Sequence, residues 1–408
     1  MPSANNYNHT VEMDMIGGLM KTTSRLTIAT AFAAFATTGA MAADLGGNCC
    51  SDLEERVAEL EATTARKGNR KVSLEVSGQV NRVVVWHNDS DSRVSKFTSR
   101  DNDGRSGSRF RFKGSAKIDS NWSAGFLIEI GVDNNESAAT NDRAAAALAT
   151  QERAGVLFRH TMLYVKNKRL GTLRLGRTNT AAEGITEICL GCAITPNSGE
   201  EGGQVSGIVG RTMLGIDGTR RNGVHYVSPE LGGFVLYSSW FHVGDPGQQN
   251  DGTAKSNNDA WDIAVRYANE FNGIRVAAGI AYSEAEGGAG TGEIETISGS
   301  ASMLHVASGL VLQGSAGQVE NKAGVKSDTW YLSGGVSRKF NPIGKTTMTV
   351  GYGQADKAGI DTTNYGVGIS QNVDAAAMDI YGNWRHYDDG TATDNEVDIF
   401  TVGARIRF

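Results

Sequence analysis

The sequence predicts an all-β protein, a transmembrane β-barrel of 16 antiparallel strands that follows a short N-terminal helix. Three observations predict this fold. Apolar and polar residues alternate with a period of two from Val72 onward. Short and long connections between these segments also alternate. The last segment ends on an aromatic residue, Phe408. We therefore divide the chain into a leader region, 1–42, a helical region, 43–70, and the barrel, 71–408.

The N-terminal region carries the pattern of an export signal. Lys21 and Arg25 precede an apolar stretch, 26–35, and small residues then form an A-x-A motif. We expect cleavage directly after this motif, before Ala43. A buried core helix is the alternative, which the position, the charge and the motif disfavour. The polar residues 1–19 are either an over-extended start or an unstructured extension.

The region 43–70 predicts a short periplasmic helix. Residues 51–54 form a capping box. Leu53, Val57, Leu60 and Thr64 follow at the 4-3-4 spacing of a coiled coil. A seam of about two heptads would make a marginal helix alone, so a symmetric oligomer would supply the missing partner surface. The alternatives are a helix packed on its own barrel and a frayed tether.

Two cysteines, Cys49 and Cys50, lie directly before this helix. They could pair between chains of an oligomer, bond to each other or stay free. The residue before them, Asn48, argues against a lipidated cysteine.

The first and last predicted strands show the alternation most clearly. In the first, Leu74 and Val76 share an apolar face, whereas Glu75 and Gln79 share the polar one. A strand with one face toward lipid and one toward a lumen has this period. The last strand repeats the pattern with these outward residues: Phe400, Val402, Ala404, Ile406 and Phe408.

The connections complete the barrel pattern. Short turns contain pairs or triplets of turn-forming residues, and long polar segments separate them. This rhythm gives 16 strands, an even number that leaves both ends in the periplasm. Backbone groups in lipid must all be paired, so the sheet must close. A soluble β-sandwich is the alternative, which the leader and the terminal strand disfavour. The short turns are predicted at 119–121, 167–169, 229–233, 270–273, 308–309, 341–344 and 374–375.

Several kinds of chemistry are not indicated. The sequence has no H-E-x-x-H and no G-x-S-x-G motif. We therefore predict no enzyme activity, no cofactor, no metal and no nucleic acid partner. Cys189-x-x-Cys192 could be a zinc half-site, a redox pair or a disulfide. Export into an oxidising compartment favours the disulfide.

Five stretches resemble the general diffusion porins of Gram-negative bacteria, in order and in spacing. One of them, residues 221–229, resembles an R-N-x-V-x-Y-x-S-P strand of that family. The segment 43–74 resembles the alphaproteobacterial branch. The other four stretches are residues 108–114, 159–165, 171–177 and 209–211.

The resemblance implies an outer-membrane homotrimer that lets ions and small hydrophilic solutes diffuse passively. A substrate-selective channel is the alternative. Outer-membrane lipid and lipopolysaccharide would surround the barrel, and the assembly machinery would recognise the strand that ends in Phe408.

The resemblance also implies an inward-folded third loop, about 178–218, that narrows the pore. Alternation independently places Arg109, Arg111 and Arg159 on the polar face. These bases could create a field across the pore, pin the loop, or do both. The predicted basic wall comprises Arg109, Arg111, Arg159, Arg174, Arg177 and Arg211. Facing acids would come from Glu183, Glu187, Glu200 and Glu201.

Overall fold

A computed structural model provides the coordinates for this chain. It describes residues 71–89, 94–100, 107–134, 154–194, 216–242, 259–286, 292–357, 359–388, 390 and 396–408. The predicted leader, the helix of 43–70 and the pair Cys49 and Cys50 lie outside these residues. Within them, no helix is long and apolar enough to cross a membrane.

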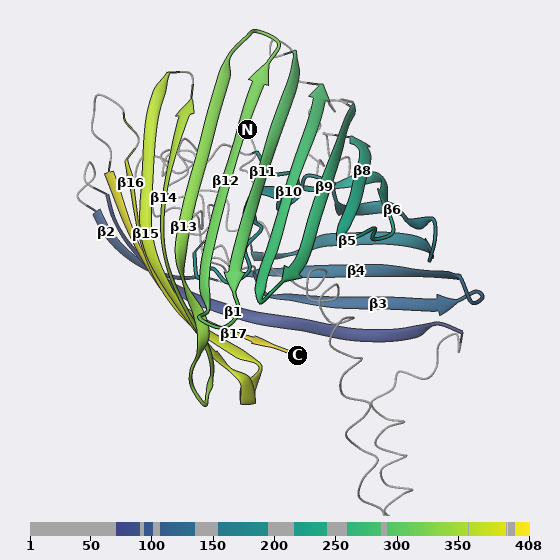
Figure 1. Cartoon of the computed structure of the whole chain (residues 1–408), viewed down its shortest axis with the longest axis horizontal. Coiled ribbons are helices and arrows are strands. Elements are labelled where there is room, and N and C mark those ends of the chain that lie inside the picture. The colour runs from purple at the N-terminus through teal and green to yellow at the C-terminus, as the bar shows by residue number, and fades with distance from the viewer. Residues whose placement is uncertain are drawn as a thin grey trace, which may run out of the picture.

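The described residues form one sheet that closes on itself, because the first strand pairs with the last. Every neighbouring pair is antiparallel, and sequential strands are neighbours around the ring (Figure 1). The first nine strands are β1 (Ser73–Asp89), β2 (Val94–Arg100), β3 (Arg109–Lys117), β4 (Trp122–Asn134), β5 (Ala154–Asn167), β6 (Gly171–Asn179), β7 (Arg220–Val227), β8 (Phe234–His242) and β9 (Asp259–Phe271).

The second half of the ring contains β10 (Ile274–Glu286), β11 (Glu293–His305), β12 (Leu310–Asn321), β13 (Lys326–Asn341), β14 (Gly344–Lys357), β15 (Ile360–Val373), β16 (Met378–Asp388) and β17 (Glu396–Arg407). In this half, β10 to β13 follow one another along one wall in Figure 1. Two short 3-10 helices, η1 (Ile185–Glu187) and η2 (Asp374–Ala376), complete the elements.

The 17 strand segments make 16 barrel strands, as predicted. Both β2 and β3 pair antiparallel with β1, where β2 meets the end of β1 and β3 meets its beginning. Val83 lies opposite Arg100 and Gln79 lies opposite Arg109. β2 and β3 are therefore two parts of one barrel strand, interrupted between residues 100 and 109. The closed 16-stranded barrel is confirmed.

The two faces of the sheet differ as the alternation predicts. Outward side chains are apolar and exposed, such as Leu74 and Val76 on β1, whereas inward ones such as Asn81 are polar and buried. An apolar outer band with a polar interior is the signature of a barrel in lipid. Exposed aromatic residues near the short turns are Trp122, Phe234, Phe271, Phe340 and Phe408; those near the long loops are Trp86, Trp240, Trp261, Trp330 and Tyr365.

The short turns are held by their own side chains. Asp119 Oδ1 accepts hydrogen bonds from the backbone N–H groups of Asn121 and Trp122, at 2.7 and 2.9 Å. These bonds lower the pKa of Asp119 because they favour the carboxylate. Asn167 closes the next turn in the same manner, through N–H groups of residues 169 and 170. Turn-forming residues thus fix the connections that the sequence predicted as short.

Candidate functional site

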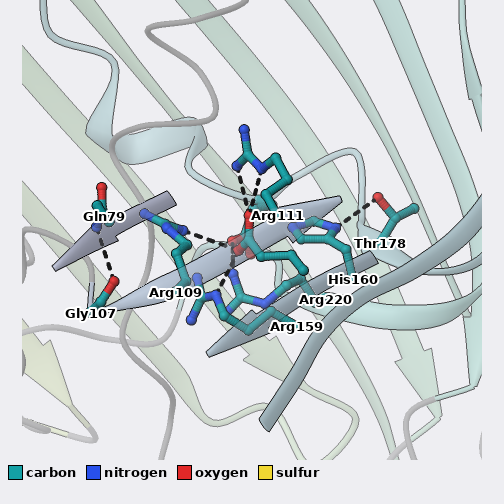
Figure 2. A network of polar contacts seen from close by, with 10 residues as sticks. Gln79, Gly107, Arg109, Arg111, Arg159, His160, Thr178 and Arg220 are labelled. Carbon is teal, nitrogen blue, oxygen red and sulfur yellow. Dashed lines mark hydrogen bonds and ion pairs between the residues drawn. The ribbon is translucent and has the colours of Figure 1, made fainter. Parts of the chain in front are cut away.

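A fully buried carboxylate on the inner wall gathers three arginines. Glu129 Oε1 lies 3.1 Å from Arg109 Nη1 and 2.7 Å from Arg159 Nε. Its other oxygen, Oε2, accepts two hydrogen bonds from Arg111, at 2.9 and 2.7 Å. Figure 2 shows these guanidinium groups converging on one point. Charge-assisted bonds of this kind offset part of the cost of burying the carboxylate. We call Glu129, Arg109, Arg111 and Arg159 the arginine cluster.

Strand register and one bulge build the arginine cluster. Arg111 on β3 lies directly opposite Glu129 on β4, and Arg109 is two residues away on the same face. On β5, His160 pairs with Glu129 and Phe158 with Ile130, so the residue between them is a bulge. That residue is Arg159. A bulge lets two successive side chains approach the same face, which strict alternation forbids.

A second ion pair links the wall to the connection after β6. Glu183 Oε1 lies 3.4 Å from Arg220 Nη1, and both side chains are almost fully buried. Burial raises the pKa of Glu183 to about 7, and Asp217 adds to this rise while Arg220 opposes it. Figure 2 places Arg220 beside Arg159. With Glu129 and Glu183 both ionised, these four arginines still leave a net positive charge on this side of the lumen.

The described part of this connection, residues 180–194 and 216–219, contacts the inner face of the wall. Backbone N–H groups of Ala181 and Ala182 donate to the carboxylate of Asp262 on β9. Farther along, the N–H groups of Ala193 and Ile194 donate to the hydroxyl of Thr349 on β14. Between these points, the hydroxyls of Ser300 and Ser302 on β11 accept hydrogen bonds from the backbone N–H groups of Ile188 and Leu190. The wall thus supplies side-chain acceptors along most of the segment.

A disulfide lies within this segment, where Cys189 is bonded to Cys192. Cys189 is buried, and the sulfur of Cys192 lies 3.6 Å from the hydroxyl of Ser333. Just before it, the 3-10 helix η1 contains Glu187, which is also buried. The segment is therefore covalently tightened where it crosses β11 to β13.

The predicted site residues fall into distinct places. Arg109, Arg111 and Arg159 lie together, and Glu183 is near them through Arg220. Arg174 lines a pocket on the inner face whose lining also includes Arg111 and Glu183. Arg177 belongs instead to the outward series of β6, because Leu173 and Leu175, four and two residues earlier, are exposed on the outer face. Three predicted residues lie outside the described part of the chain: Arg211, Glu200 and Glu201.

Two residues of this site, Glu129 and Arg220, were not among the predicted site residues. The signal for Glu129 was a carboxylate on the polar face of the strand next to the Arg109/Arg111 strand. Arg220 sits where β7 begins, and only the folded connection brings Glu183 to it.

Within the described ranges, no group of three or more His, Cys, Asp or Glu side chains is arranged to hold a metal ion.

Comparisons with known proteins agree with this architecture. An anion-selective porin from Comamonas acidovorans aligns over 83% of this chain and 100% of its own, with 17% identity and a TM-score of 0.61. OmpF of Salmonella typhi, in complex with daunomycin, aligns over 83% and 98%, with 15% identity and a TM-score of 0.56. The trimer form of OmpT from Vibrio cholerae aligns over 83% and 99%, with 13% identity and a TM-score of 0.54.

These likenesses establish a shared fold. A search of curated proteins found no match. The family model of the Gram-negative porins matches residues 29–392, most of the chain. The chain belongs to the Gram-negative porin family.

Proposed function

We propose that this protein forms a water-filled pore in the outer membrane for passive diffusion of ions and small hydrophilic solutes. One observation carries the proposal: an apolar outer face encloses a polar inner wall on which three arginines surround the buried carboxylate of Glu129. A barrel of this strand number is wide enough for an aqueous channel. A wall built only for stability would not need four arginines around two carboxylates.

The arginine cluster would act together with the segment after β6 as the narrow part of the pore. Fixed positive charge on one side orients dipolar solutes and penalises apolar ones, whose passage disrupts ordered water. Glu183 and Glu187 lie on the segment itself. The complete inward loop, about 178–218, and the contributions of Arg211, Glu200 and Glu201 belong to this proposal.

We extend the proposal to assembly and location. The trimer form of OmpT from Vibrio cholerae supports a homotrimer. Export would remove the leader before Ala43, and the helix of 43–70 would remain in the periplasm. The barrel-assembly machinery would recognise the strand that ends in Phe408. Outer-membrane lipid and lipopolysaccharide would surround the barrel. We place the chain in the alphaproteobacterial branch and assign it no enzyme activity.

Conductance of the purified protein in a planar lipid bilayer tests the proposed function. We expect ohmic current that rises in steps, grouped in threes if the trimer inserts as a unit. Heat-denatured protein at the same concentration is the control. Folded protein that gives no current would overturn the channel.

A further inference from the structure

A pocket of about 340 Å³ lies between the inner wall and Thr180, Ala181 and Glu183 of the connection after β6. Its wall side is formed by residues of β1 and of β3 to β9. Part of its lining, such as Glu75 and Lys113, is close to the short-turn ends of β1 and β3. The pocket therefore extends from the arginine cluster toward the short-turn side of the barrel.

Arg174 is one of the cationic side chains that line this pocket, together with Arg111, Lys113 and Arg266. It lies on β6, opposite Tyr164 on β5 and His225 on β7, and residues directly opposite in a sheet have neighbouring side chains. In the described part of the chain, no carboxylate contacts the Arg174 guanidinium. The Arg174 side chain is only partly exposed. A cation held in a confined space without a carboxylate creates a positive potential there.

A second lining guanidinium is held by its neighbours. Arg266 on β9 donates from Nη2 to the carbonyl oxygens of Ala181 and Glu183, at 3.3 and 2.6 Å. Its guanidinium carbon lies 5.2 Å from the ring centre of Tyr237, which also lines the pocket. These contacts orient the group without changing its charge, so Arg266 adds to the positive potential around Arg174.

The acids near the pocket are already engaged by other cations. Glu75 faces Lys113 at 3.9 Å, and both are more than half exposed to water. Glu183 contacts Arg220, and Arg111 is bound to Glu129. The positive potential at Arg174 is thus not balanced from within its own lining. The complementary ligand is an anion that can accept hydrogen bonds from a planar guanidinium.

We propose that this pocket is a binding subsite for small anionic solutes that carry a phosphate or carboxylate group, with Arg174 as the principal contact. The inference rests on the proposed channel and specifies which solutes dwell in it. Binding must be weak enough to release the solute, as in any conducting pore. Phosphate and carboxylate share the required chemistry, and the experiment separates them.

Saturation of single-channel current tests the subsite. The full-length protein is placed in a planar bilayer in chloride, and inorganic phosphate or acetate is added in increasing amounts. We expect a saturable decrease of chloride current. Arg174→Gln should weaken the apparent affinity about tenfold, the effect of losing one charge-assisted contact. Lys168→Gln removes the same charge from an exposed turn and should leave the affinity unchanged.

Each result of the current-saturation experiment supports or overturns the subsite. Saturation by phosphate alone assigns the subsite to phosphate, and saturation by both anions assigns it to the shared anionic group. Current without saturation by either anion, or saturation that survives R174Q, overturns the subsite while the channel stands. If R174Q does not assemble, Arg174→Lys keeps the charge and loses the planar fork. Saturation with unchanged affinity in R174K would then also overturn the assignment.

Discussion

Glu183 and Arg220 are paired inside the barrel, with Glu183 Oε1 located 3.4 Å from Arg220 Nη1. The pair joins the connection after β6 to the first residue of β7. Because burial raises the pKa of Glu183 to about 7, its charge changes within the neutral range. The charged groups that influence this carboxylate are Arg220, Asp217, Arg159 and Arg221.

This titration predicts a pH-dependent ion preference. Glu183 should be mostly protonated near pH 6 and mostly ionised near pH 8, roughly one pH unit to either side of its pKa. As the pH rises, the lumen gains one negative charge per barrel, so preference for anions should fall. The reversal potential in a salt gradient measures this change. Glu183→Gln should remove the difference between the two pH values.

An exposed acid provides the control for the pH effect. Glu230 lies on the short turn between β7 and β8 and faces water. Glu230→Gln should keep the pH dependence of the unmodified protein. Equal reversal potentials near pH 6 and pH 8 in the unmodified protein would contradict the role of Glu183.

Removing the charge of Glu129 should destabilise the barrel. In Glu129→Gln, Arg109 and Arg159 would stay largely buried without the carboxylate that now binds them. Breaking a buried ion pair from one side costs about 3–5 kcal/mol. We expect a lower unfolding temperature in detergent. The change in gel mobility on heating measures this temperature. Glu75→Gln, which removes one partner of an exposed ion pair, should leave the unfolding temperature almost unchanged. An unchanged unfolding temperature in E129Q would show that the cluster does not stabilise the wall.

The sequence predicted the faces of the strands well, and the reason is physical. A strand with lipid on one side and water on the other must alternate, so Arg109 and Arg111 could be assigned to the lumen from their neighbours Phe110 and Phe112. The same rule fails where the backbone departs from period two. Arg159 and His160 are adjacent, yet the bulge brings both toward Glu129. No residue type in that segment predicts the bulge.

Contacts between the wall and the connection after β6 were beyond prediction. Asp262 and Thr349 lie 87 residues apart, and each reads as an ordinary inward polar residue of its strand. Their role depends on where the segment runs inside the closed barrel. Arg177 shows where the resemblance to the family misleads. The resemblance implied that Arg177 faces the lumen, but its register with Thr161 and Asn222 places it in the outward series.

The seam that closes the barrel should be sensitive to one added methyl group. The N–H of Gly78 donates to the carbonyl of Phe408 at 2.9 Å, and the N–H of Phe408 donates back at 3.1 Å. A Cβ at Gly78 would lie 2.5 Å from the Phe408 ring and 2.6 Å from the carbonyl oxygen of Arg109. Gly78→Ala should therefore cost about 1–3 kcal/mol through overpacking.

The yield of folded barrel in a refolding assay measures this effect. Gly382→Ala is the matched control, since its added Cβ would approach no atom closer than 3.3 Å. Equal yields for the two variants would mean that the seam adapts to the methyl group.

The anchors of the segment after β6 should control the size of the current. Asp262 is buried and accepts hydrogen bonds from two successive backbone N–H groups, at 3.1 and 2.9 Å. Asp262→Ala removes both acceptors, and hydrogen bonds to a charged group contribute about 1.5–3 kcal/mol each. The beginning of the segment should then move away from the wall and alter single-channel conductance. Asp262→Asn keeps one acceptor oxygen and should give an intermediate change.

Thr349→Val, at the other anchor, should change the conductance in the same direction, because Ala193 and Ile194 lose their shared hydroxyl. Conductance unchanged in both D262A and T349V would show that the segment does not limit the flow of ions.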